Sequence, residues 1–357
     1  MRGRWFVALV ACATLVVAGC GGDDDDEGGG NGGGSDSSGN VPGLTVAVAT
    51  TQSDILNYVA EAQGFFEEEN VDVTIRDNTQ ANTTSMVVSG QVDIAAFAAV
   101  APLIASGQGR PASTIYGISG GGVGGFAIGK DVESLEDLRN VDDCRIGTFP
   151  AGTSSYGYGT LYNEKFELGC EVVPLQDAAS EVAALASDRV DAVVGGYAFL
   201  APAVEEQDAN VLVDTREPEQ RARYIGEDFP EVVFWGLRDN LEEKRDSLGR
   251  YMAALDKARQ FIEEQSDEQV AAILSDLEVF SSLSEDEIVP TVVEPFRIYM
   301  GAGSQDGYIS EEAWEVGLER YELFGVPDFD ASAEENQYDQ AVNMEYYEEG
   351  IGAPSGE

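Results

Sequence analysis

Short apolar runs with strand character alternate with helix-like segments from residue 44 onward, and this alternation limits the possible folds more than any other feature. Strands are predicted at 44–49, 71–75, 92–97 and 113–118, and a helical segment separates each strand from the next. Strands that alternate with helices form a mostly parallel sheet with helices on both faces. The sequence therefore predicts an α/β fold.

A second unit of the same kind follows, and the chain then returns to helices. The second unit has predicted strands at 144–149, 171–175 and 192–194, with helices at 154–166 and 178–187 between them. After Pro230 come a strand at 232–237 and helices at 241–265, 266–276, 284–300 and 310–323. This order predicts two lobes, each with a mostly parallel sheet flanked by helices, joined by crossing strands.

The N-terminus has the layout of an export signal. Arg2 and Arg4 precede an apolar run at 6–18, which is too short for a permanent membrane span. The small residues at 17–19, directly before Cys20, resemble a bacterial lipobox, in which the cysteine is lipidated and begins the mature protein. We expect export and lipid anchoring on the extracytoplasmic face of a membrane. The alternative is a core helix with an incidental cysteine, which the polar tract after residue 20 disfavours.

These features divide the chain into six parts. Residues 20–42 contain glycine, aspartate and serine with almost nothing apolar to pack, so they are predicted to be a flexible linker after the lipidated cysteine. The predicted parts are a signal peptide at 1–19, the linker at 20–42, the first part of lobe I at 43–126, lobe II at 127–231, the return to lobe I with C-terminal helices at 232–328, and an acidic, mostly irregular tail at 329–357 with one short helix near 338–348.

Composition excludes several classes of function. The chain carries 66 acidic and 20 basic residues, a formal net charge of −46, so nothing in it resembles the basic surface that nucleic acid requires. The acidity could serve cation capture or only solvation, and its spread along the whole chain favours solvation. Histidine is absent, which excludes Ser-His-Asp and Cys-His catalysis and imidazole-bound zinc. We predict no metal and no cofactor.

Two cysteines remain in the folded part, Cys144 and Cys170. Each begins an apolar run, and a helix-like stretch separates the two runs. Adjacent parallel strands of such a β-α-β unit place their first residues close together, so an exported protein should form a disulfide here. The alternative is two separate reduced thiols.

The order of motifs resembles the bacterial solute-binding proteins of the nitrate, sulfonate, taurine and thiamine-precursor type, the SsuA/THI5-like family. The resemblance covers residues 44–328. The matching segments are 63–67 before 71–73, 90–94 with Ala101 and Pro102, 134–138 before the strand at 144, 188–193, and 308–310.

The resemblance implies a type II periplasmic-binding-protein fold and a role in transport. Such proteins are not enzymes; they act as monomers that capture a small solute between two lobes and deliver it to an ABC permease and its ATPase. The solute would be sulfonate-, nitrate- or taurine-like, or pyrimidine- or aromatic-like. One rival is a ligand sensor that presents its closed form to a membrane receptor. A second rival is an enzyme like the thiamine-pyrimidine synthase of the same family, which the absence of histidine disfavours.

The candidate binding residues lie in four loops. Ligands of open α/β lobes bind beyond the carboxyl ends of the strands, where loops lead into helix N-termini. Two loops of this kind offer hydroxyls and free N–H groups, although ordinary helix capping is the alternative: Thr51, Gln52, Ser53 and Asp54 in lobe I, and Gly152, Thr153, Ser154 and Ser155 in lobe II. The resemblance adds two more: Phe97, Ala98 and Ala99, and Gly196 with Tyr197. Tyr197 could stack on a ligand or cover the sheet.

The four loops contain no arginine, and the loop at residues 97–99 is apolar. Both features disfavour nitrate and sulfonates and favour an organic solute with an apolar or aromatic body.

Two further patterns mimic catalytic motifs. Residues 120–125 match G-x-G-x-x-G, but a strand follows instead of a helix, so we interpret them as an irregular or hinge-adjacent segment. Residues 117–121 match G-x-S-x-G, which has no catalytic meaning in a chain without histidine.

Overall fold

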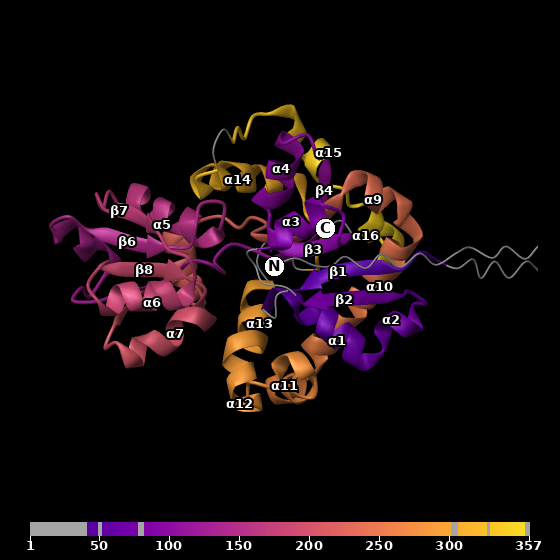
Figure 1. Cartoon of the computed structure of the whole chain (residues 1–357), viewed down its shortest axis with the longest axis horizontal. Helices are drawn as coiled ribbons and strands as arrows, with labels where there is room; N and C mark the ends of the chain where they lie inside the picture. Colours follow the sequence, from indigo (N-terminus) through magenta and orange to yellow (C-terminus); the bar gives the residue numbers. More distant parts are fainter. Residues whose placement is uncertain (1–40, 49–51, 78–81, 301–305, 327–328, 354–357) are drawn as a thin grey trace, which may run out of the picture. The chain divides into compact units, whose positions relative to one another are not determined.

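The chain forms two five-stranded sheets, each accompanied by its own helices (Figure 1). The computed structural model describes residues 41–48, 52–77, 82–300, 306–326 and 329–353. The predicted signal peptide, Cys20 and most of the linker lie outside this range. The described residues belong to one compact unit. We call the part built on the first sheet lobe I and the part built on the second lobe II.

The sheet of lobe I has the strand order β2-β1-β3-β10-β4. Its strands are β1 (Leu44–Val48), β2 (Val73–Asp77), β3 (Ile94–Ala98), β4 (Ala112–Ser119) and β10 (Val232–Leu237). Strands β1, β2 and β3 pair in parallel, with Leu44 opposite Val73, whereas β10 is antiparallel to both of its neighbours. Four strands therefore run in one direction, and the fifth is the one that enters from lobe II.

Helices from both ends of the chain surround this sheet. The early ones are η1 (Gln52–Asp54), α1 (Ile55–Gln63), α2 (Phe65–Glu68), α3 (Thr83–Val88) and α4 (Val100–Gly107). The later ones are α9 (Arg238–Glu243), α10 (Arg245–Glu264), α11 (Asp267–Ser275), η4 (Glu278–Phe280), α12 (Glu285–Ile288), η5 (Val289–Val293), α13 (Glu294–Met300), α14 (Glu311–Tyr321), η6 (Glu322–Phe324), η7 (Glu334–Asn336), α15 (Tyr338–Ala341) and α16 (Glu345–Gly350). Of these, η6 packs against lobe II. Every residue of β4 and β10 is buried, as expected for strands covered on both faces.

Lobe II repeats the arrangement with the strand order β7-β6-β8-β5-β9. Its strands are β5 (Phe126–Gly129), β6 (Arg145–Thr148), β7 (Glu171–Pro174), β8 (Ala192–Gly195) and β9 (Asn210–Val213). Its helices are η3 (Leu135–Asn140), α5 (Ser154–Lys165), α6 (Ala178–Ala186), α7 (Tyr197–Glu206) and α8 (Pro218–Tyr224). Here β5, which enters from lobe I, is the strand antiparallel to its neighbours.

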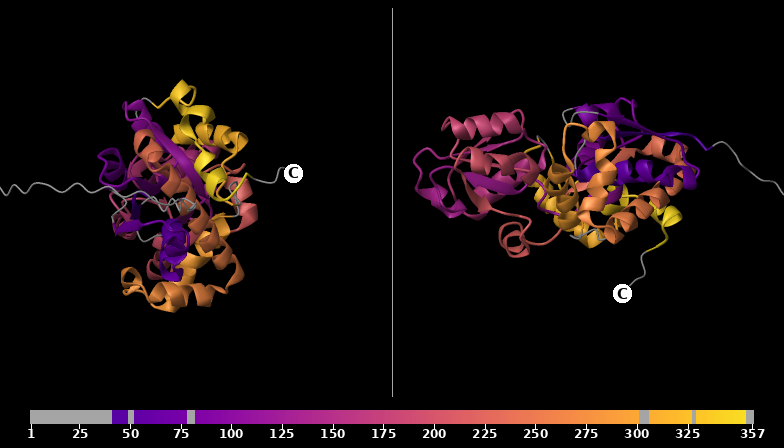
Figure 2. Two further views of the ribbon diagram at one scale, coloured as in Figure 1. Left: turned by 90° about the vertical axis from the view of Figure 1, so that its right-hand side faces the viewer. Right: turned by 90° about the horizontal axis from the view of Figure 1, so that it is seen from below.

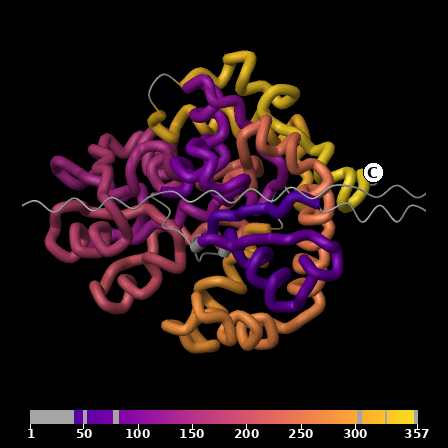
Figure 3. Tube along the Cα trace, turned by 45° about the vertical axis from the view of Figure 1, so that its right-hand side comes forward, coloured from indigo at the N-terminus to yellow at the C-terminus, as the bar shows by residue number. Residues whose placement is uncertain are grey.

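The chain passes between the lobes twice, as the colour sequence of Figure 3 shows. The first crossing, residues 120–125, joins β4 to β5, and the second crossing, residues 225–231, leads from α8 into β10. The predicted α/β fold with two mostly parallel sheets flanked by helices is confirmed. Each sheet contains one antiparallel strand because the chain enters each lobe as a crossing strand.

An aspartate performs the same structural task in both lobes. The Asp93 carboxylate accepts a hydrogen bond from the Thr45 N–H in β1 at 2.8 Å, and the Asp191 carboxylate accepts one from the Arg145 N–H in β6 at 2.8 Å. Each aspartate follows a valine just before a strand and binds the neighbouring parallel strand. The Val-Asp pairs within 90–94 and 188–193 therefore align strands rather than contact a ligand.

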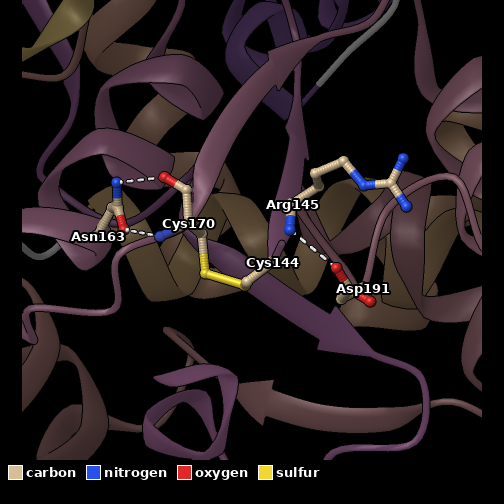
Figure 4. The surroundings of a disulfide bond; sticks show 5 residues. All are labelled: Cys144, Arg145, Asn163, Cys170 and Asp191. Carbon is tan, nitrogen blue, oxygen red and sulfur yellow. Dashed lines mark hydrogen bonds between the residues drawn. A yellow bond between two sulfur atoms is a disulfide. The ribbon is translucent and has the colours of Figure 1, made fainter. Parts of the chain in front are cut away.

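The disulfide between Cys144 and Cys170 is present, as predicted (Figure 4). Arg145 lies opposite Glu171 in the parallel pair of β6 and β7, so the preceding residues are also neighbours, with their Cα atoms 4.5 Å apart. The Asn163 side chain binds both the N–H and the carbonyl of Cys170 at 2.9 Å. The bond therefore joins two strands whose spacing the sheet already sets.

The acidic C-terminal stretch belongs to the folded body over residues 329–353. Val342 forms an isolated parallel bridge with Thr114 of β4, and Tyr346 and Tyr347 are buried. Arg245 of α10 pairs with two glutamates of this stretch. Figure 2 shows the yellow C-terminal helices in two further views. The sequence predicted an acidic, mostly irregular tail with one short helix near 338–348. The structure has the short helices η7, α15 and α16 in this stretch, and its aromatic residues pack against lobe I.

A buried glutamate in lobe II has an unusual environment. Glu181 of α6 has no exposed surface, and neither carboxylate oxygen has a hydrogen-bond partner within the described residues. Burial raises the pKa of Glu181 to about 9, and the nearby Asp177 adds to the rise. The side chain is therefore protonated in the folded protein at neutral pH.

Glu181→Gln should reduce the pH dependence of stability. In the unfolded chain Glu181 has its ordinary pKa, so its contribution to stability is present below pH 5 and is lost as the pH rises towards about 9. Because one pKa unit corresponds to about 1.4 kcal/mol, Gln should raise the free energy of unfolding at pH 8 by more than about 1 kcal/mol relative to its effect at pH 5. Urea unfolding at both pH values measures this. The exposed Glu171→Gln is the control, and equal pH dependence in both variants contradicts the assignment.

Candidate functional site

A cavity of about 100 Å³ lies between residues of the two lobes, beyond the carboxyl ends of several strands. Lobe I contributes residues from η1, β3 and the start of β10, and lobe II contributes residues that follow β6 and β8. The lining residues are Ser53, Asp54, Ala96, Phe97, Ala98, Val123, Gly124, Phe149, Thr153, Ser154, Ser155, Gly196, Phe199, Glu231 and Val232. This is where ligands of open α/β sheets bind.

The structure brings eight of the predicted binding residues to this cavity. They come from all four predicted loops: Ser53, Asp54, Phe97, Ala98, Thr153, Ser154, Ser155 and Gly196. Thr51 lies outside the described residues, and Gln52 begins η1 but its side chain is not described. Of the described candidates, Ala99, Gly152 and Tyr197 lie outside the lining.

These three residues have structural tasks instead. The Ala99 N–H donates to the Glu231 carbonyl at 2.9 Å, and the Gly152 N–H donates to the Phe324 carbonyl at 2.7 Å. The Arg216 guanidinium lies 3.4 Å from the centre of the Tyr197 ring, so that ring face is already occupied. Tyr197 was expected either to stack on a ligand or to cover the sheet. Its position favours a structural contact in lobe II.

Phe199, two residues after Tyr197, lines the cavity in its place. It pairs with Phe149, with ring centroids 6.2 Å apart, and 39% of its surface is exposed. Sequence reasoning missed both rings. The sequence did contain a signal for Phe199. It is an aromatic residue in the first turn of α7, two positions after Tyr197, so it faces a different side of the helix. The other lining residues that were missed are Ala96, Val123, Gly124, Glu231 and Val232.

Glu231 is the most informative of the missed residues. Its side chain has no exposed surface, yet it is an acidic residue directly before an apolar strand. The N–H groups of Gly122 and Val123 donate to Oε2 at 2.6 and 2.9 Å, and the Gly124 N–H donates to Oε1 at 2.9 Å. The Tyr158 hydroxyl donates to Oε2 at 2.6 Å. We call this group of donors the carboxylate cradle.

Burial raises the pKa of Glu231, and the cradle limits that rise. The largest effect is the loss of hydration, which disfavours the charged form. Hydrogen bonds from Tyr158, Gly124, Ser154 and Gly122 act in the opposite direction. This geometry satisfies the ionised carboxylate, because hydrogen-bond donors point at both of its oxygens.

The cradle explains the glycine-rich segment at 120–125. Gly122 has φ +123°, and a Cβ on Gly124 would lie 2.7 Å from the Ser154 Cβ, so a larger residue at either position would disturb the segment. The backbone thereby approaches both Glu231 and the N-terminus of α5. The segment is the first crossing, which agrees with the hinge-adjacent interpretation, and it binds the protein's own carboxylate rather than a phosphate.

The hydroxyls at the N-terminus of α5 are bonded within the protein. Thr153 caps the helix by accepting from the Tyr156 N–H and donates to the Pro150 carbonyl at 2.8 Å. The Ser155 hydroxyl donates to the Val194 carbonyl at 2.6 Å and accepts from the Phe149 N–H at 2.8 Å. The Ser154 hydroxyl interacts with Glu231. Helix capping, the alternative for this loop, therefore accounts for Thr153.

The described part of the chain has neither a metal-binding cluster nor a membrane-spanning helix. Among those residues, no cluster of three or more acidic or cysteine side chains is arranged to hold a metal ion. No helix within the same residues is long and apolar enough to cross a membrane.

Two α/β lobes with two crossings and a cavity at the strand ends form the periplasmic-binding-protein fold. The chain belongs to the NMT1/THI5-like family, whose model matches residues 53–269. No curated protein sequence matches the chain.

Solved structures with the same fold include three ligand-binding proteins. A ligand-binding component of an ABC-type import system from Staphylococcus aureus, solved with zinc bound, is 13% identical with a TM-score of 0.64, over 87% of this chain and 99% of that one. The periplasmic nitrate-binding protein NrtA from Synechocystis is 14% identical with a TM-score of 0.64, over 88% and 89%. The periplasmic aliphatic sulphonate-binding protein SsuA from Escherichia coli is 15% identical with a TM-score of 0.59, over 79% and 86%. At sequence identities this low, the comparison shows a shared fold and no more.

Tyr158→Phe should destabilise the protein by about 1–3 kcal/mol, because it removes one hydrogen bond to a buried carboxylate. Urea unfolding gives the difference in free energy. Tyr156→Phe on the same helix, outside the cradle, is the matched control and should lie within about 0.5 kcal/mol of the unchanged protein. Equal effects of the two substitutions would contradict the role assigned to the cradle.

Proposed function

We propose that this protein is the solute-binding component of an ABC importer. It captures a small organic solute between lobes I and II and delivers it to a permease driven by an ATPase. The observation that carries the proposal is the cavity, whose walls come from both lobes at the strand ends in a chain of this family. Because closure of two lobes on a ligand buries it, the closed form can serve as the signal that a permease recognises.

The geometry of the crossings supports this function. Both crossings lie beside the cavity: Val123 and Gly124 of the first and Glu231 of the second are lining residues. A change in the angle between the lobes would therefore alter the cavity directly. Its volume is small beside the roughly 300–1,000 Å³ of pockets for drug-sized ligands, so we expect a small solute.

We also propose where the protein is located and that it binds its solute without catalysing a reaction. Residues 1–19 would be a cleaved signal, and lipidated Cys20 would hold the folded body on the extracytoplasmic face through the linker. The chain has no histidine to act as an acid–base catalyst near neutral pH, which supports binding over an enzyme reaction. We expect the protein to act as a monomer.

A thermal-shift screen of the purified protein tests the binding function. The screen should include sulfonates, nitrate, pyrimidines, flavins, aromatic acids and amines. A ligand present at 100 times its dissociation constant adds about 2.7 kcal/mol to the free energy of unfolding, which is readily detected. We expect at least one class to stabilise the protein. If no compound shifts the melting temperature of a well-folded sample, a solute-binding role is contradicted.

Cys20→Ala should release the protein from the membrane. The unchanged protein should incorporate a labelled fatty acid and sediment with membranes, because a lipid on Cys20 is its proposed anchor. The variant should incorporate no label and appear in the soluble fraction. Cys12→Ala, within the proposed signal, is the control and should remain in the membrane fraction. A Cys20→Ala protein that still carries label and sediments with membranes contradicts the anchor.

A further inference from the structure

The ionisable residues that line the cavity are both acids. Asp54 and Glu231 are lining residues, with 1% and 0% of their surface exposed. No lysine or arginine is found among the described lining residues. Arg216 of lobe II lies on Tyr197 and pairs with Asp214 at 2.7 Å. Arg221, whose side chain lies beside Gly122, donates to the Thr215 carbonyl at 3.2 Å. The ionisable side chains of the described lining are therefore two acids, with no lysine or arginine beside them in that lining.

The place where an anionic group would be expected is already filled. Backbone N–H groups in a glycine-rich segment beside a helix N-terminus are a favourable site for an anion. Here the N–H groups of residues 122–124 all donate to Glu231, and the Ser154 hydroxyl at the start of α5 interacts with the same carboxylate. The hydroxyls of Thr153 and Ser155 are also bonded within the protein. An anionic solute would meet a like charge, which opposes binding.

The remaining wall is aromatic and apolar. Phe97 lines the cavity from lobe I, and Phe149 and Phe199 line it from lobe II. The faces of aromatic rings attract organic cations, most strongly where water is excluded. Val123 and Val232 add apolar contact for the body of a solute.

We propose that the cavity binds a small organic cation, a protonated amine or a quaternary ammonium with an apolar body. Glu231 occupies the anion position as the protein's own group, Asp54 faces the positive charge, and the three phenylalanines surround the apolar part. The inference rests on the proposed solute-binding function and names the class of solute. The expected charge of the solute distinguishes this protein from oxyanion-binding proteins that have the same fold.

Three probes of one shape test the charge preference. Choline, its uncharged analogue 3,3-dimethyl-1-butanol and the anionic 3,3-dimethylbutanoate are to be compared by calorimetric titration of the full chain, together with the smaller cations tetramethylammonium and piperidinium. We expect at least one cation to bind, choline at least tenfold more tightly than the alcohol, and the anion not to bind. An anion that binds more tightly than its cationic counterpart overturns the inference.

The outcomes separate this inference from the proposed function. If the cations fail and an anionic or neutral compound of the wider screen binds, the charge assignment is wrong while the binding function stands. If neither the probes nor any compound of the screen binds, the proposed function itself fails. A cation as the tightest ligand supports both.

Asp54→Asn tests the residue assigned to the positive charge. It preserves the shape of the side chain and should weaken binding of the tightest cationic probe at least tenfold, with little effect on the uncharged alcohol. Glu181→Gln is the matched control, because Glu181 is also a buried acid but lies outside the cavity lining, and it should leave the affinity unchanged. An equal loss in both variants, or a loss in neither, contradicts the role of Asp54.

Glu231→Ala tests whether the cradle is an anion site that the protein fills itself. The variant should be less stable, and formate or acetate should restore part of its melting temperature by occupying the vacated donors. The same salts should not stabilise the unchanged protein or Glu181→Ala. A folded Glu231→Ala protein that these anions do not stabilise contradicts the assignment. Should the variant fail to fold, the probe series and Asp54→Asn still decide the inference.

Discussion

The buried Glu231 carboxylate is the interaction on which the relation between the two lobes depends. It belongs to the second crossing, while three of its donors are backbone N–H groups of the first crossing. The Tyr158 hydroxyl adds a donor from α5 of lobe II. Without this carboxylate, the N–H groups of Val123 and Gly124 would lose their buried acceptor, which is unfavourable for any fold, and the Gly122 N–H would keep only the Tyr158 hydroxyl. One side chain therefore holds both crossings and lobe II together.

The same interaction determines what the cavity offers a solute. Side chains from elsewhere also bind the carbonyls of the first crossing: Thr215 donates to Gly122 and Tyr162 donates to Gly125. The N–H groups of residues 122–124 and the carbonyls of Gly122 and Gly125 thus have hydrogen-bond partners within the protein. A fold that is shared with binders of nitrate and sulphonate can thus present an acidic, aromatic cavity, because local contacts rather than the fold set the chemistry of the site.

Features that depend on sequence-local patterns could be predicted, and features that depend on long-range contacts could not. The alternation of strands and helices predicted both lobes, and Cys144 and Cys170 were paired because each begins a strand of one β-α-β unit. Four candidate loops reached the cavity because strand ends meet at one edge of a sheet. Glu231 escaped prediction because its N–H donors lie more than 100 residues away in the chain. Tyr197 was named in place of Phe199 because the rotation of α7 decides which ring faces the cavity.

A crystal structure of the protein with its tightest-binding small molecule tests the central claim most directly. The account predicts ligand density between the lobes, in contact with Asp54 and the phenylalanine rings, while the Glu231 carboxylate remains on the N–H groups of residues 122–124. The ligand should carry a positive charge on the atoms nearest Asp54. A ligand whose acidic group occupies those N–H groups with Glu231 displaced, or a ligand bound outside the cavity, would contradict the account.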